Sequence, residues 1–330
     1  MSGPKKFIIL IMTVFILFCV YWAAGRSAMI NSVRTQIDEM QSSGYKVVHK
    51  GLSIGGFPLK FRARLAEPEI ASPRSDDQPW SIKADDVRLE ALTLNPLKWN
   101  AVHRGDARID LRGPKGERWL FDARPLNIDM TVRAKLNGDV KAFDLLGTQL
   151  KTQAVIGTLP PIVAIDSARV TAAPQVKGMR FDAAIENIFL EKETLKNFQK
   201  IFGPRIESLS GQALAIGLGG LGEDTLAAWK TSAHIIGDDW TLNWGGTEFQ
   251  GGFSLTTSET GLSGIIRIEV ESVNDLIRRL EDANIFSGKQ AQNAKLAAIL
   301  LPVNASGRQE ITMTFRDGFL TLFGQKIFEF

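Results

Sequence analysis

The sequence predicts an α+β fold that is mainly β: one large curved antiparallel sheet with a few covering helices, preceded by a single transmembrane helix. Three observations predict this fold. An uncharged apolar run lies near the N-terminus, alternation with a period of two recurs through most of the remaining chain, and three segments show helical spacing. The length of 330 residues, with 44% hydrophobic and 23% charged residues, is typical of a folded protein.

The charge and the rare residue types exclude several classes of function. Lys and Arg number 39 against 36 Asp and Glu, a net charge of +3 that is too balanced for a dedicated nucleic-acid binder. One cysteine excludes an intramolecular disulfide framework and a thiolate zinc cluster, and three histidines lie far apart in the sequence. We therefore expect no cofactor, no metal and no nucleic-acid partner.

The apolar run Phe7–Ala24 predicts a membrane anchor. Its 18 uncharged residues would span about 27 Å as a helix, close to the thickness of a bilayer core. Lys5 and Lys6 precede the run, so the N-terminus is expected in the cytoplasm and everything after residue 25 outside it, in the periplasm of a bacterium. The alternative is a cleaved signal peptide; Tyr21 and Trp22 stand where such a peptide needs small residues, which favours an uncleaved anchor.

The domain boundaries follow from these patterns. Residues 1–25 form the anchor, residues 26–44 a helical stalk, and residues 45–330 a β-rich domain with a soft subdivision near residues 172–205. Gly44 ends the stalk. The stalk carries an apolar stripe at helical spacing, which is expected to dock on the domain: Met29, Ile30, Val33, Ile37 and Met40.

Strict alternation in Leu59–Leu65 predicts a strand with an apolar face and a basic face made of Lys60, Arg62 and Arg64. Similar segments are Trp80–Leu94, Val102–Leu111, Asn127–Leu136, Leu150–Ile156, Ile162–Val170, Gly178–Ile188, Ile206–Leu218, Ile311–Phe315 and Phe319–Phe323. Asn137-Gly138 and Asp317-Gly318 are typical of hairpin turns. The expected helices are Leu190–Phe202, a segment around Val273–Leu280, and Lys289–Leu301.

One stretch carries a family resemblance. Gly51–Pro68, with the turn Gly56-Phe57-Pro58 before a long strand, resembles the signature of an uncharacterised bacterial family, domain of unknown function 2125. The segments Trp240–Gly252, Ser272–Leu301 and Asp317–Ile327 are similar to its later elements. The layout is also similar to AsmA-like envelope proteins, some of which move phospholipids between membranes, an analogy at the level of fold alone.

No catalytic constellation can be assembled from the sequence, so we expect a protein that is not an enzyme. There is no nucleophile elbow and no phosphate-binding loop of the Walker type. The acidic pairs Asp76-Asp77, Asp85-Asp86 and Asp238-Asp239 could bind a hard cation, but adjacent side chains on a strand point to opposite faces, which favours solvated charges. The basic strand face is either a solvated surface or a contact for anionic lipid headgroups or polysaccharide. The stripe Lys192, Lys196, Lys200 belongs to a helix that either covers the sheet or lies on a membrane.

The predicted function is an inner-membrane-anchored periplasmic protein that binds lipid or acyl chains on an apolar sheet surface. The alternative is a structural or assembly factor that contacts another envelope protein. The candidate lipid-contacting residues lie on two predicted strands: Leu59, Phe61, Leu65, Ile128, Met130 and Val132.

Overall fold

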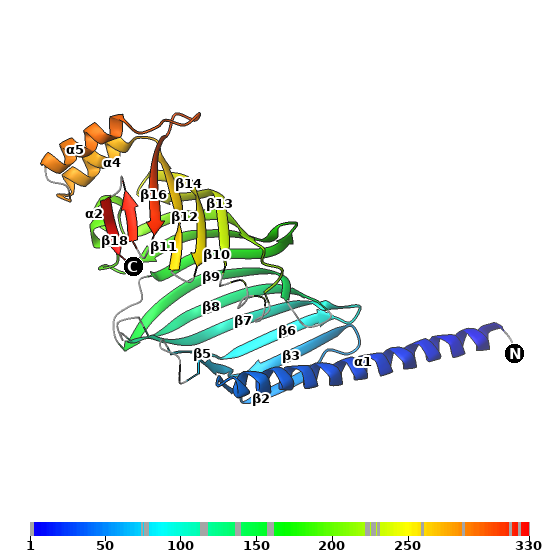
Figure 1. The fold of residues 1–330 in the computed structure, drawn as a ribbon. Coiled ribbons are helices and arrows are strands. Elements are labelled where there is room, and N and C mark those ends of the chain that lie inside the picture. The colour runs from blue at the N-terminus through cyan, green and yellow to red at the C-terminus, as the bar shows by residue number, and fades with distance from the viewer. Residues whose placement is uncertain are drawn as a thin grey trace. The chain divides into compact units, whose positions relative to one another are not determined.

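The computed structural model describes residues 3–73, 75, 79–112, 118–135, 140–156, 162–221, 225, 229, 232–258, 261–285, 288–316, 319–322 and 325–329. The chain divides into two compact units, and Figure 1 draws the helices and strands of the chain. Unit 1 contains Met1–Val132 and Gln153–Thr158, and unit 2 contains Arg133–Thr152 and Leu159–Phe330. Every described strand pairing is antiparallel, which confirms the predicted fold class of a mainly antiparallel protein with an apolar N-terminal helix.

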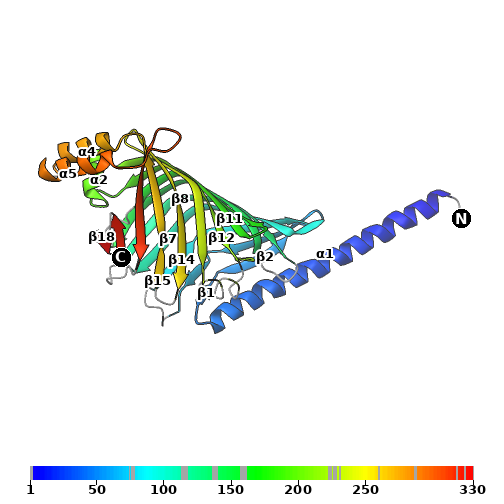
Figure 2. The ribbon, with the colours of Figure 1, turned by 45° about the horizontal axis from the view of Figure 1, so that its top comes forward.

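Helix α1 (Gly3–Ser42) joins the predicted anchor and stalk in one uninterrupted helix (Figure 2). It is long and apolar enough to cross a membrane. Beyond Gly25 the stripe of Met29 to Met40 is half-buried while most positions between are exposed, so this face of the helix packs on unit 1. Arg26 Nε donates to the Ile54 carbonyl and Gln41 Nε2 to the Val47 carbonyl.

The strands of unit 1 are β1 (Lys46–Val48), β2 (Gly51–Gly55), β3 (Lys60–Ala66), β4 (Glu69–Ala71), β5 (Trp80–Ala84), β6 (Asp86–Leu92) and β7 (Asn95–Arg112). They pair in the order β2, β3, β6, β7, β5, β4, β1. The prediction of one strand over Trp80–Leu94 is wrong. The chain breaks at Asp85, and β5 and β6 pair with different halves of the long strand β7.

Unit 2 is an antiparallel meander. Strand β8 (Arg118–Ala134) precedes it, and β9 (Val140–Ile156) begins it. The following strands are β10 (Ile162–Gln175), β11 (Gly178–Leu190), β12 (Arg205–Ile216), β13 (His234–Trp244), β14 (Thr247–Ser258), β15 (Gly261–Val270), β16 (Gln309–Arg316), β17 (Phe319–Leu322) and β18 (Gln325–Glu329). From β9 to β18 each strand pairs with the next. The predicted turns Asn137-Gly138 and Asp317-Gly318 lie outside the described residues.

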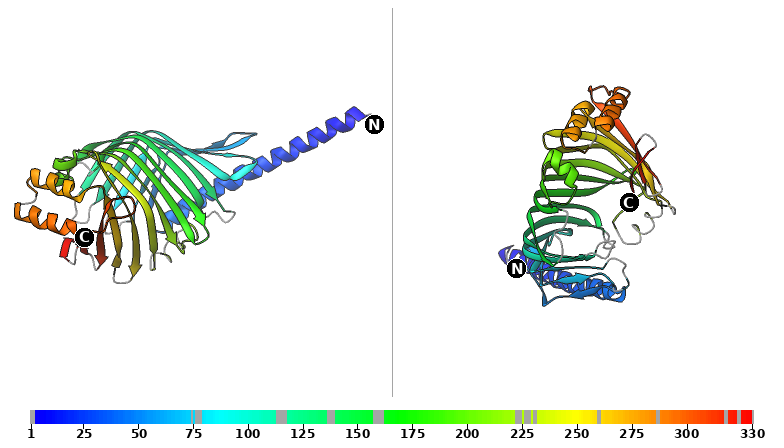
Figure 3. Two further views of the ribbon diagram at one scale, coloured as in Figure 1. Left: turned by 90° about the horizontal axis from the view of Figure 1, so that it is seen from above. Right: turned by 90° about the vertical axis from the view of Figure 1, so that its left-hand side faces the viewer.

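Three described helices of unit 2 are α2 (Lys196–Phe202), α4 (Val273–Asp282) and α5 (Gly288–Ile299). In Figures 1 and 3 they lie at one end of the strands of this unit, with α4 and α5 in orange. The side chain of Ser272 caps α4 by accepting from the Asp275 amide.

The predicted helix Leu190–Phe202 is wrong in its first half. Leu190 still belongs to β11, and its amide donates to the Pro204 carbonyl. A turn follows in which the Thr194 amide donates to the Glu191 carbonyl, and Leu195 adopts a left-handed backbone conformation (φ 49°). Lys192 therefore lies outside the helix, and the predicted stripe of three lysines on one helix does not form.

Candidate functional site

The sheet of unit 2 has one apolar face in the middle of its strands. The register places Ala183 opposite Gly211, Gly211 opposite Trp240, and Trp240 opposite Gly251, so these four residues form one row across the sheet. Side chains two residues apart on a strand share a face, so the rows on either side belong to the same face. These rows are also apolar. We define the apolar face by its half-buried side chains: Val170, Ala183, Ile185, Leu209, Trp240, Leu242, Phe253, Ile266, Ile268 and Met313.

Helices α2, α4 and α5 cover one end of this face. On α2, the ring of Phe202 packs 5.2 Å from the ring of Trp244 and 5.6 Å from that of Phe249. The Trp244 indole also donates to the Gly203 carbonyl at 2.9 Å. Helices α4 and α5 pack beside this contact, around the buried Val270.

A second cluster closes the opposite end of the strands. Its buried side chains include Met179 and Leu218, and Trp229 packs on them while its indole donates to the Ile216 carbonyl at 2.8 Å. Between the two ends, Val170, Ala183, Trp240, Phe253, Ile266 and Met313 belong to none of the packed clusters of the described residues. The middle of the apolar face therefore has no helix over it in the described part of the chain.

The opposite face of the same sheet is polar. The Arg169 guanidinium forms two hydrogen bonds to the Asp144 carboxylate, at 3.0 and 2.6 Å, and it holds the pKa of Asp144 below its ordinary value. Asn243 donates to the Ser208 hydroxyl at 2.8 Å. Half-exposed ion pairs of this kind contribute little stability and are typical of a solvated surface.

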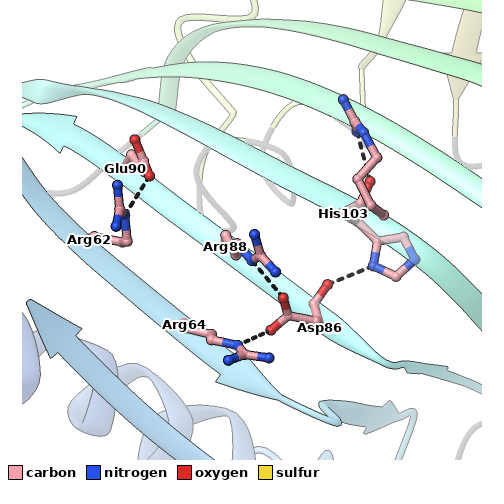
Figure 4. A network of polar contacts seen from close by, with 7 residues as sticks. Arg62, Arg64, Asp86, Arg88, Glu90 and His103 are labelled. Atoms are coloured by element: carbon pink, nitrogen blue, oxygen red, sulfur yellow. Dashed lines mark hydrogen bonds and ion pairs between the residues drawn. The ribbon is translucent and has the colours of Figure 1, made fainter.

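Unit 1 carries a network of ionic side chains on β3 and β6 (Figure 4). Arg62 lies opposite Glu90 in the register and donates to its carboxylate at 2.6 Å, and Lys60 donates to the same group. Hydrogen bonds from Lys60 and Arg62 lower the pKa of Glu90. The basic strand face that the sequence predicts is therefore paired with acidic side chains of β6.

Asp86 is the second acidic centre of this network. Its carboxylate accepts from Arg64 at 2.6 Å and from Arg88 at 2.7 Å. Burial raises the pKa of Asp86, but these two hydrogen bonds outweigh burial and leave the pKa below its ordinary value. The neighbouring Asp85 accepts instead from the Asp106 amide, so Asp85 and Asp86 do not converge on one point.

No metal centre is found in the part of the chain that the structure describes: no group of three or more His, Cys, Asp or Glu side chains is placed to hold an ion. His103 is buried, and its Nδ1 lies 2.7 Å from the Asp86 carbonyl oxygen. Asp238 and Asp239 line a shallow depression on the polar face together with Arg180. Asp76 and Asp77 lie outside the described residues.

The six candidate lipid-contacting residues occupy three different environments. Leu59 lies in the turn before β3 and is 71% exposed, whereas Phe61 is 4% exposed beneath α1. The Phe61 ring stacks on that of Trp22 at 6.1 Å, which leaves no surface there for a ligand. The other four are half-buried, Leu65 on β3 and three on β8: Ile128, Met130 and Val132.

Sequence reasoning missed the residues of the uncovered apolar face. Alternation in Ile265–Ile268 and in Gly251–Phe253 carried the signal, since each pattern indicates a strand with one apolar side. The pattern did not indicate which apolar sides the helices of this protein would leave free.

Comparison with known proteins identifies a family. A family model described as "Uncharacterized protein conserved in bacteria (DUF2125)" matches residues 22–325. No curated protein and no solved structure matches the chain. The predicted likeness to AsmA-like envelope proteins stays a prediction.

Proposed function

The chain belongs to the DUF2125 family of bacterial proteins, and from its structure we propose that it is a membrane-anchored, non-enzymatic protein that binds acyl chains of lipids on the apolar face of unit 2. The anchor is α1, and the rest of the chain lies in the periplasm. The observation that carries the proposal is the contrast between the two faces of one sheet. One face is polar and solvated, and the other is apolar, with no helix over its middle among the residues that the structure describes.

The energetics favour an apolar ligand of extended shape. Apolar surface left in water costs about 25 cal/mol per Å², so an uncovered face is unfavourable unless something occupies it. Each buried methylene of an acyl chain contributes about 0.8 kcal/mol. The row from Ala183 to Gly251 crosses four strands, and neighbouring strands lie about 4.8 Å apart, so the row extends for about 14 Å. This length accommodates a large part of one acyl chain.

The location of the chain can be tested by fusions to its C-terminus. Periplasmic placement predicts an active alkaline phosphatase fusion and a dark fusion to green fluorescent protein, which does not fold when exported unfolded. The reverse pair of results would contradict the proposed topology. Intact mass of protein purified from membranes then distinguishes a retained anchor from a cleaved signal sequence.

Ligand binding is tested with two matched substitutions. Ile266 lies on the apolar face opposite Phe253, whereas its neighbour Ile265 lies opposite Ser254 on the polar face and is exposed. Full-length protein carrying Ile266→Asp or Ile265→Asp is purified in mild detergent, and the co-purifying lipids are quantified by mass spectrometry. We expect Ile266→Asp to lose bound lipid and Ile265→Asp to retain the wild-type amount.

Circular dichroism must show native strand content for both variants. Equal lipid content in wild type and both variants would contradict binding on this face. A stoichiometric protein partner that replaces lipid on wild type and is lost with Ile266→Asp would support the assembly role and overturn the lipid proposal.

A further inference from the structure

Two neighbouring turns of unit 1 expose large apolar side chains. The turn between β2 and β3 carries Phe57 and Leu59, and the turn between β6 and β7 carries Leu94, with Leu92 at the end of β6 and Leu97 near the start of β7 beside it. Leu59 is 71% exposed and Leu94 is 88% exposed. The Thr93 amide donates to the Leu59 carbonyl at 3.0 Å, which joins the two turns into one apolar tip.

The apolar tip lies against α1 at the level where the apolar run of the helix ends. The Phe57 ring packs on Trp22 at 5.2 Å and on Phe15 at 6.5 Å. The Tyr21 hydroxyl donates to the Thr93 carbonyl at 2.9 Å, and the Trp22 indole donates to the Lys60 carbonyl at 3.1 Å. Tyr and Trp at the end of a membrane span are typical of the membrane–water interface.

Several backbone polar groups of the tip are satisfied within unit 1 itself. The Thr93 side chain donates to the Pro58 carbonyl at 2.9 Å, and the Lys60 amide donates to the Gly56 carbonyl at 3.0 Å. Thr93, the polar residue at the centre of these contacts, is itself buried. Inside a bilayer an unpaired backbone group is costly, so internal pairing of this kind suits a segment that leaves water.

We propose that the apolar tip inserts into the bilayer that α1 crosses, in the leaflet that faces the domain. This inference rests on the proposed role of α1 as a retained anchor. Phe57 contacts both Phe15 and Trp22, which are seven residues apart and therefore about 10 Å apart along the helix axis. Interfacial elements bury their apolar side about 5–10 Å deep, which agrees with this extent. Lys98 follows the tip and is exposed, in place to reach lipid phosphates. Together α1 and the tip would hold unit 1 in a fixed orientation on the membrane.

The experiment uses the full chain reconstituted in vesicles of phosphatidylethanolamine and phosphatidylglycerol. In a Cys19→Ser background, Leu94→Cys or Leu59→Cys is labelled with the environment-sensitive fluorophore NBD. Val48→Cys is the control, since Val48 is also an exposed apolar residue. It follows shortly after the end of α1 at Ser42, which lies about 30 Å along the helix from Trp22. Quenching by doxyl-labelled phospholipid reports contact with the bilayer.

We expect blue-shifted emission and at least threefold stronger lipid quenching for the labels at Leu94 and Leu59 than for the label at Val48. Equal emission and quenching at all three positions would overturn the inference. A label on native Cys19 distinguishes the two proposals. Strong quenching of the Cys19 label together with water-like emission of the tip labels would reject insertion of the tip and leave the anchor in place. An unquenched Cys19 label would reject the anchoring role of α1 and, with it, insertion of the tip.

Discussion

The contact between Trp22 and Phe61 provides a direct test of how α1 docks on unit 1. The two rings stack at 6.1 Å with an interplanar angle of 13°, and Phe61 is 4% exposed. A Cβ added to Gly25 would lie 2.6 Å from Phe61 Cζ, so the helix backbone also packs on this ring. Without α1, Phe61 would lose its contacts with Trp22 and with the backbone at Gly25.

The magnitude follows from this burial. Phe→Ala at a buried site costs about 3–5 kcal/mol, and the low end applies because a single helix supplies much of the cover. We expect Phe61→Ala to lower the free energy of unfolding by about 3 kcal/mol, and Leu59→Ala, at an exposed position, by less than about 0.5 kcal/mol. Stacked aromatic pairs contribute about 0.5–1.5 kcal/mol beyond buried area, so a double-mutant cycle between Trp22 and Phe61 should give a coupling of about 1 kcal/mol.

The assay is urea unfolding of the full chain in mild detergent, followed by the strand signal in circular dichroism. The cycle compares wild type, Trp22→Ala, Phe61→Ala and the double variant. The Trp22 indole also donates to the Lys60 carbonyl, and this hydrogen bond is lost in both variants that lack Trp22. If the bond persists in Phe61→Ala, its contribution cancels from the coupling energy. A control cycle pairs Trp22 with Leu59 and should be additive. A coupling between Trp22 and Phe61 that equals that control would refute docking of α1 through this ring.

Two further predictions concern a turn and an ion pair. Gly56 has φ +99°, and a Cβ there would lie 2.7 Å from the Lys60 carbonyl oxygen, so Gly56→Ala should lower stability by about 1–3 kcal/mol in thermal unfolding, whereas Gly55→Ala, with no atom within 4 Å, should be near neutral. The Asp122 side chain is 9% exposed, but the two arginines that pair with it, Arg108 and Arg124, are half-exposed, so Asp122→Asn should cost only about 1 kcal/mol at pH 7. The hydrogen bond from Arg108 lowers the pKa of Asp122, so this contribution is present above the unfolded pKa of about 4 and is lost as the pH falls through the lower pKa of the folded state; urea unfolding at pH 7, 5 and 3 should show the difference from wild type shrink at the lowest pH. Asp129→Asn, at a half-exposed pair, should stay within about 0.5 kcal/mol of wild type throughout, and a constant difference for Asp122→Asn across the pH range would contradict the role of the carboxylate.

Local patterns in the sequence predicted the elements whose structure is decided locally. Alternation placed Phe61 and Leu65 on one face of β3 and the arginines on the other, because successive side chains of any strand point to opposite sides. The cover over Phe61 could not be predicted this way, since Trp22 is distant in sequence and docks by tertiary packing. The first half of the helix expected at Leu190–Phe202 failed for a similar reason: the Pro204 carbonyl accepts from the Leu190 amide and keeps that residue in the sheet.

The row around Trp240 explains why the middle of the apolar face suits an elongated ligand. A Cβ added to Gly211 would lie 2.9 Å from Trp240 Cβ, and one added to Gly251 would lie 3.2 Å from Trp240 Cζ2. The indole therefore lies over the glycine of the adjoining strand and does not stand upright on the sheet. Side chains absent from the neighbouring strands leave this row lower than the ends, where Phe202 and Trp244 pack together. A row that is low, apolar and flanked by taller packed clusters offers van der Waals contact to a narrow chain of methylenes along its length, whereas a globular partner would need a protruding ridge to reach it.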